Sequence, residues 1–116
     1  MINVYGIKNC NTVRKALNWL EDNGIEYKFH DYKKEGVSSD KIGEWQKQVD
    51  WQSLINKKGT TWRKLEKEIQ ESIKDENSAA QLMQDNTSLI KRPIIEGPDS
   101  FLLGFDEGEY SAKLLS

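Results

Sequence analysis

The fold is decided by residues 4–17, which read VYGIKNCNTVRKAL and contain the one cysteine of the chain, Cys10. An apolar run at residues 2–5 predicts a short strand before the cysteine. After it, apolar residues recur with the i, i+3, i+4, i+7 spacing of one helix face. They are Val13, Ala16, Leu17 and Leu20. We therefore expect a strand that passes into a helix, with Cys10 at or just before the first helical turn.

This position favours a reactive thiol at Cys10. The first turn of a helix has free N–H groups and the positive end of the helix dipole, and both stabilise an anion. A thiolate is an anion, so the pKa of the thiol should fall below its ordinary value of about 8.5. The alternative is that a lone cysteine is a small buried apolar residue, as most are. The polar neighbours Asn9 and Asn11 favour the reactive thiol.

Length and composition predict a single domain over residues 1–116 that acts as a monomer. The net charge is −2 and both signs are mixed along the chain, which argues against direct nucleic-acid binding. No apolar run approaches the roughly 20 residues of a membrane span, and no signal peptide is visible. A single cysteine excludes an internal disulfide and suits the cytoplasm. Without a cluster of ligands at zinc spacing, no metal is expected.

The rest of the chain predicts an α/β domain interrupted by helices. Apolar residues alternate over residues 25–32, which predicts a second strand and a βαβ unit with parallel strands. His30 lies on the other face of this strand from Tyr27 and Phe29, and we interpret it as a surface or edge histidine. A polar loop is expected at residues 33–37. The end of the chain predicts strands at 94–96 and 101–103, followed by a helix.

Between these halves, residues of about 38–85 predict an all-helical insert. One helix is expected after Ser38, and a short helical segment is expected at residues 51–55. A further helix is expected to run from Thr60-Thr61 through an apolar stripe. That stripe consists of Trp62, Leu65, Ile69 and Ile73. Ser78 is expected to open a capping box for a further short helix. The tryptophans at positions 45, 51 and 62 are interpreted as core residues.

The chain resembles the arsenate reductase family of the glutaredoxin type, and most closely its Spx/MgsR and YffB-like branch. The resemblance implies a thioredoxin-like fold (βαβ…ββα) with an all-helical insert. It spans nearly the whole chain in the order of the family. The matching stretches are YGIKNCNT at 5–12, FHDY at 29–32, NKKGTTWRKL at 56–65, IKRP at 90–93 and LLGF at 102–105.

The resemblance implies a role for three residues. Cys10 matches the active cysteine, and Pro93 matches a proline that is usually cis and faces the thiol. Arg92 matches the arginine that binds an oxyanion beside the cysteine, a role that suits a permanently charged, fork-shaped donor. Taken alone, Arg92 can equally be a solvated partner of Lys91 in a basic pair.

Two departures from the family pattern bear on function. The reductases use three arginines around the oxyanion, but no arginine stands near Asn56 or near Gly104-Phe105. Arsenate is therefore expected to bind weakly. The Spx regulators often carry a Cys-x-x-Cys switch, which is absent because Val13 stands at the fourth position.

These features predict a monothiol, glutathione-dependent thiol-disulfide reductase. Cys10 is the expected nucleophile, assisted by Arg92, and glutathione is a co-substrate, with no bound cofactor. The partner is expected to be glutathione or a protein thiol. The residues expected to bind the substrate are Lys8, Asn11, Thr12, Arg14 and Pro93. The alternatives are a Spx-like regulator that docks on RNA polymerase, or an arsenate reductase.

Overall fold

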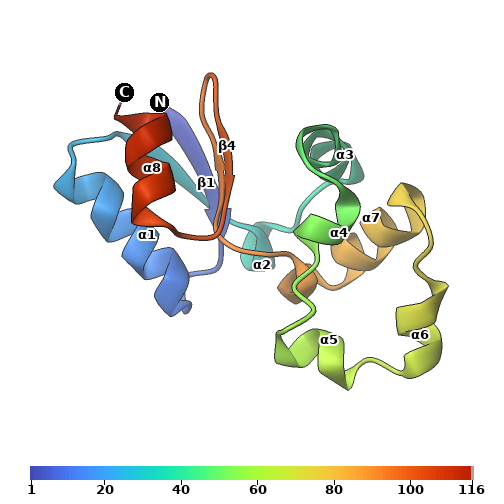
Figure 1. Ribbon diagram of the computed structural model, residues 1–116. Helices are drawn as coiled ribbons and strands as arrows, with labels where there is room; N and C mark the ends of the chain where they lie inside the picture. Colours follow the sequence, from blue (N-terminus) through green and yellow to red (C-terminus); the bar gives the residue numbers. More distant parts are fainter. Residues whose placement is uncertain (116) are drawn as a thin grey trace. The chain divides into compact units, whose positions relative to one another are not determined.

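The computed structural model describes residues 1–115, which form two compact units. The first unit joins Met1–Glu35 to the chain from Arg92 onward, and the second is Gly36–Lys91. The first unit contains the sheet, and the second is helical (Figure 1). The second unit includes the whole of the predicted insert. That both units form one domain stays a prediction.

A four-stranded sheet forms the centre of the first unit, with the strand order β2-β1-β3-β4. β1 (Ile2–Gly6) and β2 (Tyr27–Asp31) are parallel, so their carboxyl ends lie side by side. β3 (Ile94–Glu96) is antiparallel to β1, and β4 (Phe101–Leu103) is antiparallel to β3. The thioredoxin-like order of strands and helices is confirmed.

Two helices, α1 (Asn11–Asp22) and α8 (Glu107–Leu114), cover one face of this sheet (Figure 1). Alternate strand positions point to the helices, and these positions are apolar. The buried core consists of Ile2, Val4, Ala16, Leu20, Ile95, Leu102 and Tyr110. The ring of Tyr110 packs edge-on against Trp19 and Phe105. This core holds the amino-terminal half of the unit against its carboxyl-terminal half.

His30 lies on the other face of the sheet, as its register requires. It pairs with Tyr5 across the parallel strands, and the two rings stack with centroids 4.5 Å apart. Its Nε2 lies 2.9 Å from Oδ1 of Asn3. His30 is thus a partly buried side chain held by β1, and its opposite orientation to Tyr27 and Phe29 is confirmed.

The second unit packs its helices around a core of its own. The helices are α3 (Ser39–Gln48), α4 (Trp51–Leu54), α5 (Thr60–Lys64), α6 (Lys67–Ser72), α7 (Glu76–Asp85) and the 3-10 turn η1 (Thr87–Leu89). An isolated antiparallel bridge joins Ile55 to Ile90. Trp45 is 1% exposed and belongs to this core, as predicted. Trp51 and Trp62 are only partly buried, and Lys57 Nζ lies 5.5 Å from the centre of the Trp62 ring.

One predicted loop is a helix in the structure. Residues 33–37 were expected to be irregular, but α2 (Tyr32–Glu35) forms a single helical turn there. The carboxylate of Asp31 accepts hydrogen bonds from the backbone N–H groups of Lys33 (3.0 Å) and Lys34 (3.2 Å). These bonds satisfy donors that a helix start leaves open. So short a helix has no apolar periodicity by which the sequence could reveal it.

Two helix boundaries in the second unit also differ from the prediction. The expected long helix after residue 60 is broken at Leu65 and Glu66, whose ψ angles are 142° and 144°, into α5 and α6. The side chain of Gln70 donates to the carbonyl of Trp62 at 2.8 Å, which satisfies an acceptor at the break. The capping box of α7 is opened by Asp75, and Ser78 is its third helical residue.

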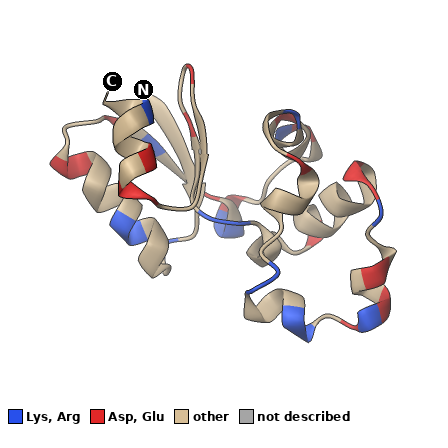
Figure 2. Ribbon diagram, in the orientation of Figure 1, with Lys and Arg blue, Asp and Glu red and all other residues tan. Residues whose placement is uncertain are grey.

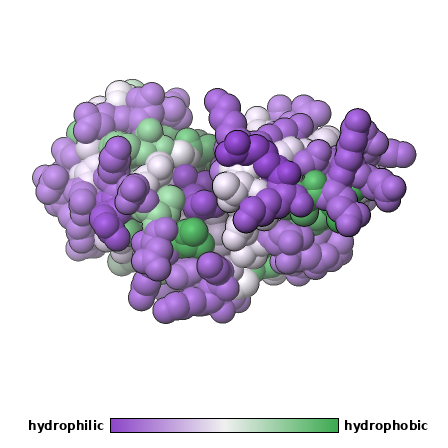
Figure 3. Space-filling model, turned by 90° about the horizontal axis from the view of Figure 1, so that it is seen from below, coloured by the Kyte–Doolittle hydropathy of each residue, from purple (hydrophilic) through white to green (hydrophobic). Residues whose placement is uncertain are grey.

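Charges of both signs are scattered over the helices of the protein (Figure 2). The face drawn in Figure 3 is mostly hydrophilic, with hydrophobic groups in separate areas. Among residues 1–115, no helix combines the length and the apolar character that crossing a bilayer requires.

Candidate active site

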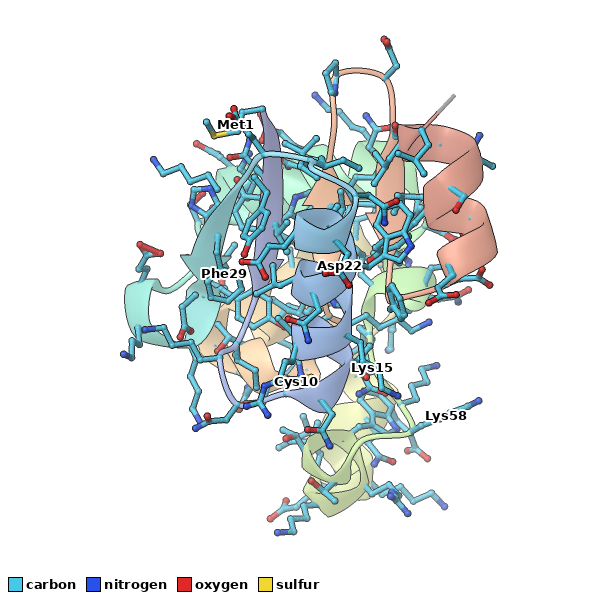
Figure 4. The ribbon with its side chains drawn as sticks, turned by 90° about the vertical axis from the view of Figure 1, so that its left-hand side faces the viewer. Met1, Cys10, Lys15, Asp22, Phe29 and Lys58 are labelled. Carbon is cyan, nitrogen blue, oxygen red and sulfur yellow. The ribbon has the colours of Figure 1, made fainter. Side chains whose placement is uncertain are left out.

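Cys10 is the N-cap residue of α1, which agrees with its predicted place at the start of the helix. It lies at the end of the helix opposite to Asp22 (Figure 4). The close packing of β1 and α1 depends on Gly6, because a Cβ atom there would lie 2.9 Å from Cγ2 of Val13. The missing side chain therefore lets the first turn of the helix, with its free N–H groups, approach the end of β1.

The backbone at Cys10 exposes the sulfur to these N–H groups. Cys10 has the extended angles φ −141° and ψ 122°, and its carbonyl accepts the first helical hydrogen bond, from Arg14 at 2.9 Å. The sulfur interacts with the backbone N–H groups of Thr12 and Val13, which the first turn leaves without an intrahelical partner. A thiolate accepts hydrogen bonds more strongly than a thiol, so these N–H groups favour the ionised form.

The pKa of the Cys10 thiol is lowered from its ordinary value by the balance of opposing effects. Partial burial raises the pKa, because it disfavours the charged form. The backbone N–H of Val13, the side chain of Arg92 and the backbone N–H of Thr12 all lower it, and so does the positive charge of Arg92. These attractions outweigh burial. Cys10 is partly exposed.

Arg92 reaches the sulfur because β3 lies beside β1. Tyr5 pairs with Ile94 in the antiparallel register, and Arg92 lies two residues before Ile94. The peptide bond between Arg92 and Pro93 is cis, as the family resemblance implied. Pro93 is buried, and its carbonyl accepts the N–H of Gly104 at 2.8 Å. Strand pairing thus brings residues that are distant in sequence to one site.

Tyr32 is a third member of this group, and sequence reasoning did not single it out as a site residue. It is 1% exposed, and its side chain interacts with Arg92. Burial raises the pKa of Tyr32 to about 12, against the lowering effect of Arg92, so the hydroxyl stays protonated at neutral pH. A guanidinium has donors only, so the hydroxyl oxygen accepts from Arg92. The buried Tyr32 side chain therefore binds the guanidinium and helps to orient it.

Tyr32→Phe should raise the pKa of Cys10 slightly, since Arg92 loses one acceptor that orients it. We expect alkylation of the thiol by iodoacetamide at pH 7 to slow by roughly twofold. This is the lower end of the effect of losing one hydrogen bond. The phenyl ring keeps the buried volume, so the melting temperature is a control for folding. An unchanged pH profile of alkylation would show that Tyr32 does not position Arg92.

The other residues predicted to bind the substrate are placed around Cys10 in different ways. Thr12 contributes its backbone N–H to the sulfur. Asn11, Thr12 and Arg14 have exposed side chains on the first turn of α1. Lys8 is exposed in the loop before Cys10 and lines a cavity. Cys10 and Arg92 are brought into contact, whereas Arg14 meets Cys10 through its backbone N–H, which donates to the Cys10 carbonyl.

The cavity beside Cys10 has a volume of about 490 Å³. Its lining consists of Ile7, Lys8, Asn9, Asp31, Lys33 and Lys34. Of this set, sequence reasoning named only Lys8 as a substrate-binding residue. The other wall was missed because it belongs to α2, and only the parallel pairing of β1 with β2 brings it to the loop that precedes Cys10. The stretch FHDY of the family resemblance ends at this wall and was the one clue to it.

Among residues 1–115, no group of three or more His, Cys, Asp or Glu side chains is arranged to hold a metal ion. The site brings together the sulfur, the guanidinium and the surrounding hydrogen-bond donors. That arrangement, at the N-terminus of the first helix of a thioredoxin-like sheet, defines a thiol site.

Residues 5–113 match the model of the ArsC family, and the chain therefore belongs to the ArsC family. A solved structure named YffB protein is 38% identical, with a TM-score of 0.92, and the match covers 98% of this chain and 99% of that chain. A solved arsenate reductase (ArsC) related protein from Brucella melitensis is 44% identical, with a TM-score of 0.76, over 97% of this chain and 92% of that chain.

A regulator is also similar to this chain. The global transcriptional regulator Spx of Listeria innocua is 30% identical over 111 residues, which are 94% of this chain and 83% of that protein. The resemblance read from the sequence is thus confirmed for the family and for its YffB-like and Spx relatives. The fold is that of the ArsC-family reductases.

Proposed function

We propose that this protein is a monothiol, glutathione-dependent thiol-disulfide reductase that acts in the cytoplasm. The observation that carries the proposal is the partly exposed Cys10 thiol, whose pKa is lowered by the N–H groups of Val13 and Thr12 and by Arg92 against the effect of burial. A thiolate at neutral pH is the nucleophile of thiol-disulfide exchange. Because the chain has one cysteine, the thiol that completes the cycle must come from outside.

The reaction has two exchange steps. The Cys10 thiolate attacks the glutathione sulfur of a mixed disulfide, and the other thiol leaves as a thiolate that takes a proton from solvent. Cys10 is then joined to glutathione by a disulfide. The thiolate of a second glutathione attacks the sulfur of the bound glutathione, and Cys10 leaves as a thiolate. In total, one mixed disulfide is reduced to a thiol, and glutathione is oxidised to glutathione disulfide.

Arg92 and the start of α1 stabilise Cys10 as nucleophile in the first step and as leaving group in the second. In both roles the sulfur carries negative charge, so a guanidinium and two N–H groups favour the thiolate. The backbone next to Pro93 lies beside the end of β1 and can hold the extended peptide of glutathione in the manner of an added strand. Asn11, Thr12 and Arg14 are available to its polar groups.

The proposal is tested by supplying glutathione, glutathione reductase and NADPH together with one of two substrates. We expect turnover with the mixed disulfide of glutathione and 2-mercaptoethanol. We expect arsenate to stay at background, because Arg92 stands without the two further arginines of the reductases. No turnover of the mixed disulfide would overturn the reductase function. Rapid reduction of arsenate would show that one arginine suffices.

A second candidate function rests on the similarity to the Spx regulator. In this case the protein docks on a partner such as RNA polymerase, and the Cys10 thiol catalyses no reaction. The two candidates make opposite predictions for Cys10→Ser. Capture of an RNA polymerase subunit that is unaffected by the substitution would favour the regulator, whereas loss of glutathione-dependent turnover would favour the reductase.

A further inference from the structure

The cavity of about 490 Å³ lies at the carboxyl edge of the two parallel strands. Gly6 and Asp31 pair at the ends of β1 and β2, and the chain leaves them as the loop to Cys10 and as α2. The edge where parallel strands end is the usual place of ligands in open α/β sheets. The volume is also in the range of small-molecule sites. The cavity therefore has the position and size of a binding site.

The charges of the cavity favour an anion. Its lining contains Lys8, Lys33 and Lys34 against the single carboxylate of Asp31. Asp31 is only 9% exposed, and its Oδ1 accepts the backbone N–H groups of Lys33 and Lys34, so its main role is to hold α2. The three lysine side chains are exposed. Three lysines against one carboxylate give the lining of the cavity a net positive charge.

The cavity is also close to the reacting sulfur. Asn9 lines it and is bonded directly to Cys10, and consecutive Cα atoms are about 3.8 Å apart. A peptide whose sulfur is joined to Cys10 can reach the lysines within one or two residues, which span about 3.5 Å each. A thiol that carries carboxylates on a short peptide frame would fit this arrangement.

We propose that this cavity binds the carboxylates of glutathione when its sulfur reacts with Cys10, and that Lys33 and Lys34 on α2 supply the selectivity. This inference rests on the proposed function and names the residues that make Cys10 selective for glutathione over other thiols. Lys8 contributes from the loop before Cys10. Disulfides of the same frame without carboxylates react with Cys10 more slowly.

The test compares oxidised glutathione with its tetraethyl ester, which has the same frame but no carboxylate charge. The rate at which each forms the Cys10 mixed disulfide is measured by intact mass. In the native protein we expect oxidised glutathione to react about three- to tenfold faster, the effect of one or two exposed ion pairs. Added salt should reduce the ratio, because exposed charges are screened.

The Lys33→Ala/Lys34→Ala protein should lose most of this preference, so that the ratio of the two rates falls towards one. Alanine is a good helix former, and the backbone bonds to Asp31 do not need the lysine side chains. Lys28→Ala/Lys113→Ala is the matched control, since it removes the same charge from β2 and α8, outside the cavity lining, and should keep the ratio of the native protein.

Two outcomes would overturn the inference, and they can be told apart. If both probes form the mixed disulfide at equal rates, or if the Lys33/Lys34 variant keeps the preference, the cavity does not select the thiol and the reductase function stands. If neither probe forms the mixed disulfide, the reductase function itself is wrong, and the inference falls with it.

Discussion

Cys10→Ser is expected to reduce glutathione-dependent turnover to background, a loss of at least about a thousandfold. A serine hydroxyl is not ionised at neutral pH, so neither Arg92 nor the first turn of α1 can make it a nucleophile. The chain has no other cysteine to replace it. The measurement is the glutathione reductase assay described above, with intact mass to confirm that the native protein carries one glutathione on Cys10.

The substitution should leave the fold intact, because serine is nearly the size of cysteine and is a preferred N-cap residue. Circular dichroism and the melting temperature are therefore the controls. Turnover that persists in folded Cys10→Ser would show that the exchange does not pass through this sulfur.

Arg92→Ala is expected to raise the pKa of Cys10 by about one unit, the lower end of the effect of a neighbouring opposite charge. Below both pKa values the thiolate fraction then falls tenfold, but the more basic thiolate is about threefold more reactive. Alkylation by iodoacetamide at a pH below both pKa values should therefore slow by roughly threefold. At a pH above both pKa values, the variant should react as fast as the native protein or faster.

Two further variants separate charge from geometry. Arg92→Lys keeps the charge but loses the fork-shaped donor, so its Cys10 pKa should lie between those of the native protein and Arg92→Ala. Lys91→Ala removes the neighbouring exposed cation and should leave the dependence of the alkylation rate on pH unchanged. Equal profiles for Arg92→Ala and Lys91→Ala would mean that Arg92 is only a surface charge.

The sequence predicted the position of Cys10 well, because the reasoning was local. A strand period, a turn and a helix period follow one another within 20 residues, and the N-terminus of a helix has the same electrostatics in any fold. Arg92 was different. From its residue type alone, Arg92 could equally have been a solvated cation beside Lys91. Only the family resemblance placed it at the sulfur. The pairing of β3 with β1 supplies the physical reason.

The cavity wall that α2 forms could not be predicted from the local sequence. α2 has four residues, too few for a helical period, and its start depends on Asp31 receiving two backbone N–H groups. Tyr32 was included only in a matching stretch, since nothing local distinguishes a buried tyrosine that binds an arginine from one in the core. The break between α5 and α6 shows the same limit, because the apolar stripe runs on across two residues that are extended.

The most direct test is the rate of alkylation of the native protein by iodoacetamide, measured against pH. The sulfur is an acid, so the thiolate and the rate increase as the pH rises through the pKa. Because the N–H groups and Arg92 lower that pKa, the midpoint should lie clearly below the ordinary value of about 8.5, with the protein reactive at neutral pH. A midpoint at or above about 8.5 would mean that the site does not hold Cys10 as a thiolate, and would contradict the proposed nucleophile.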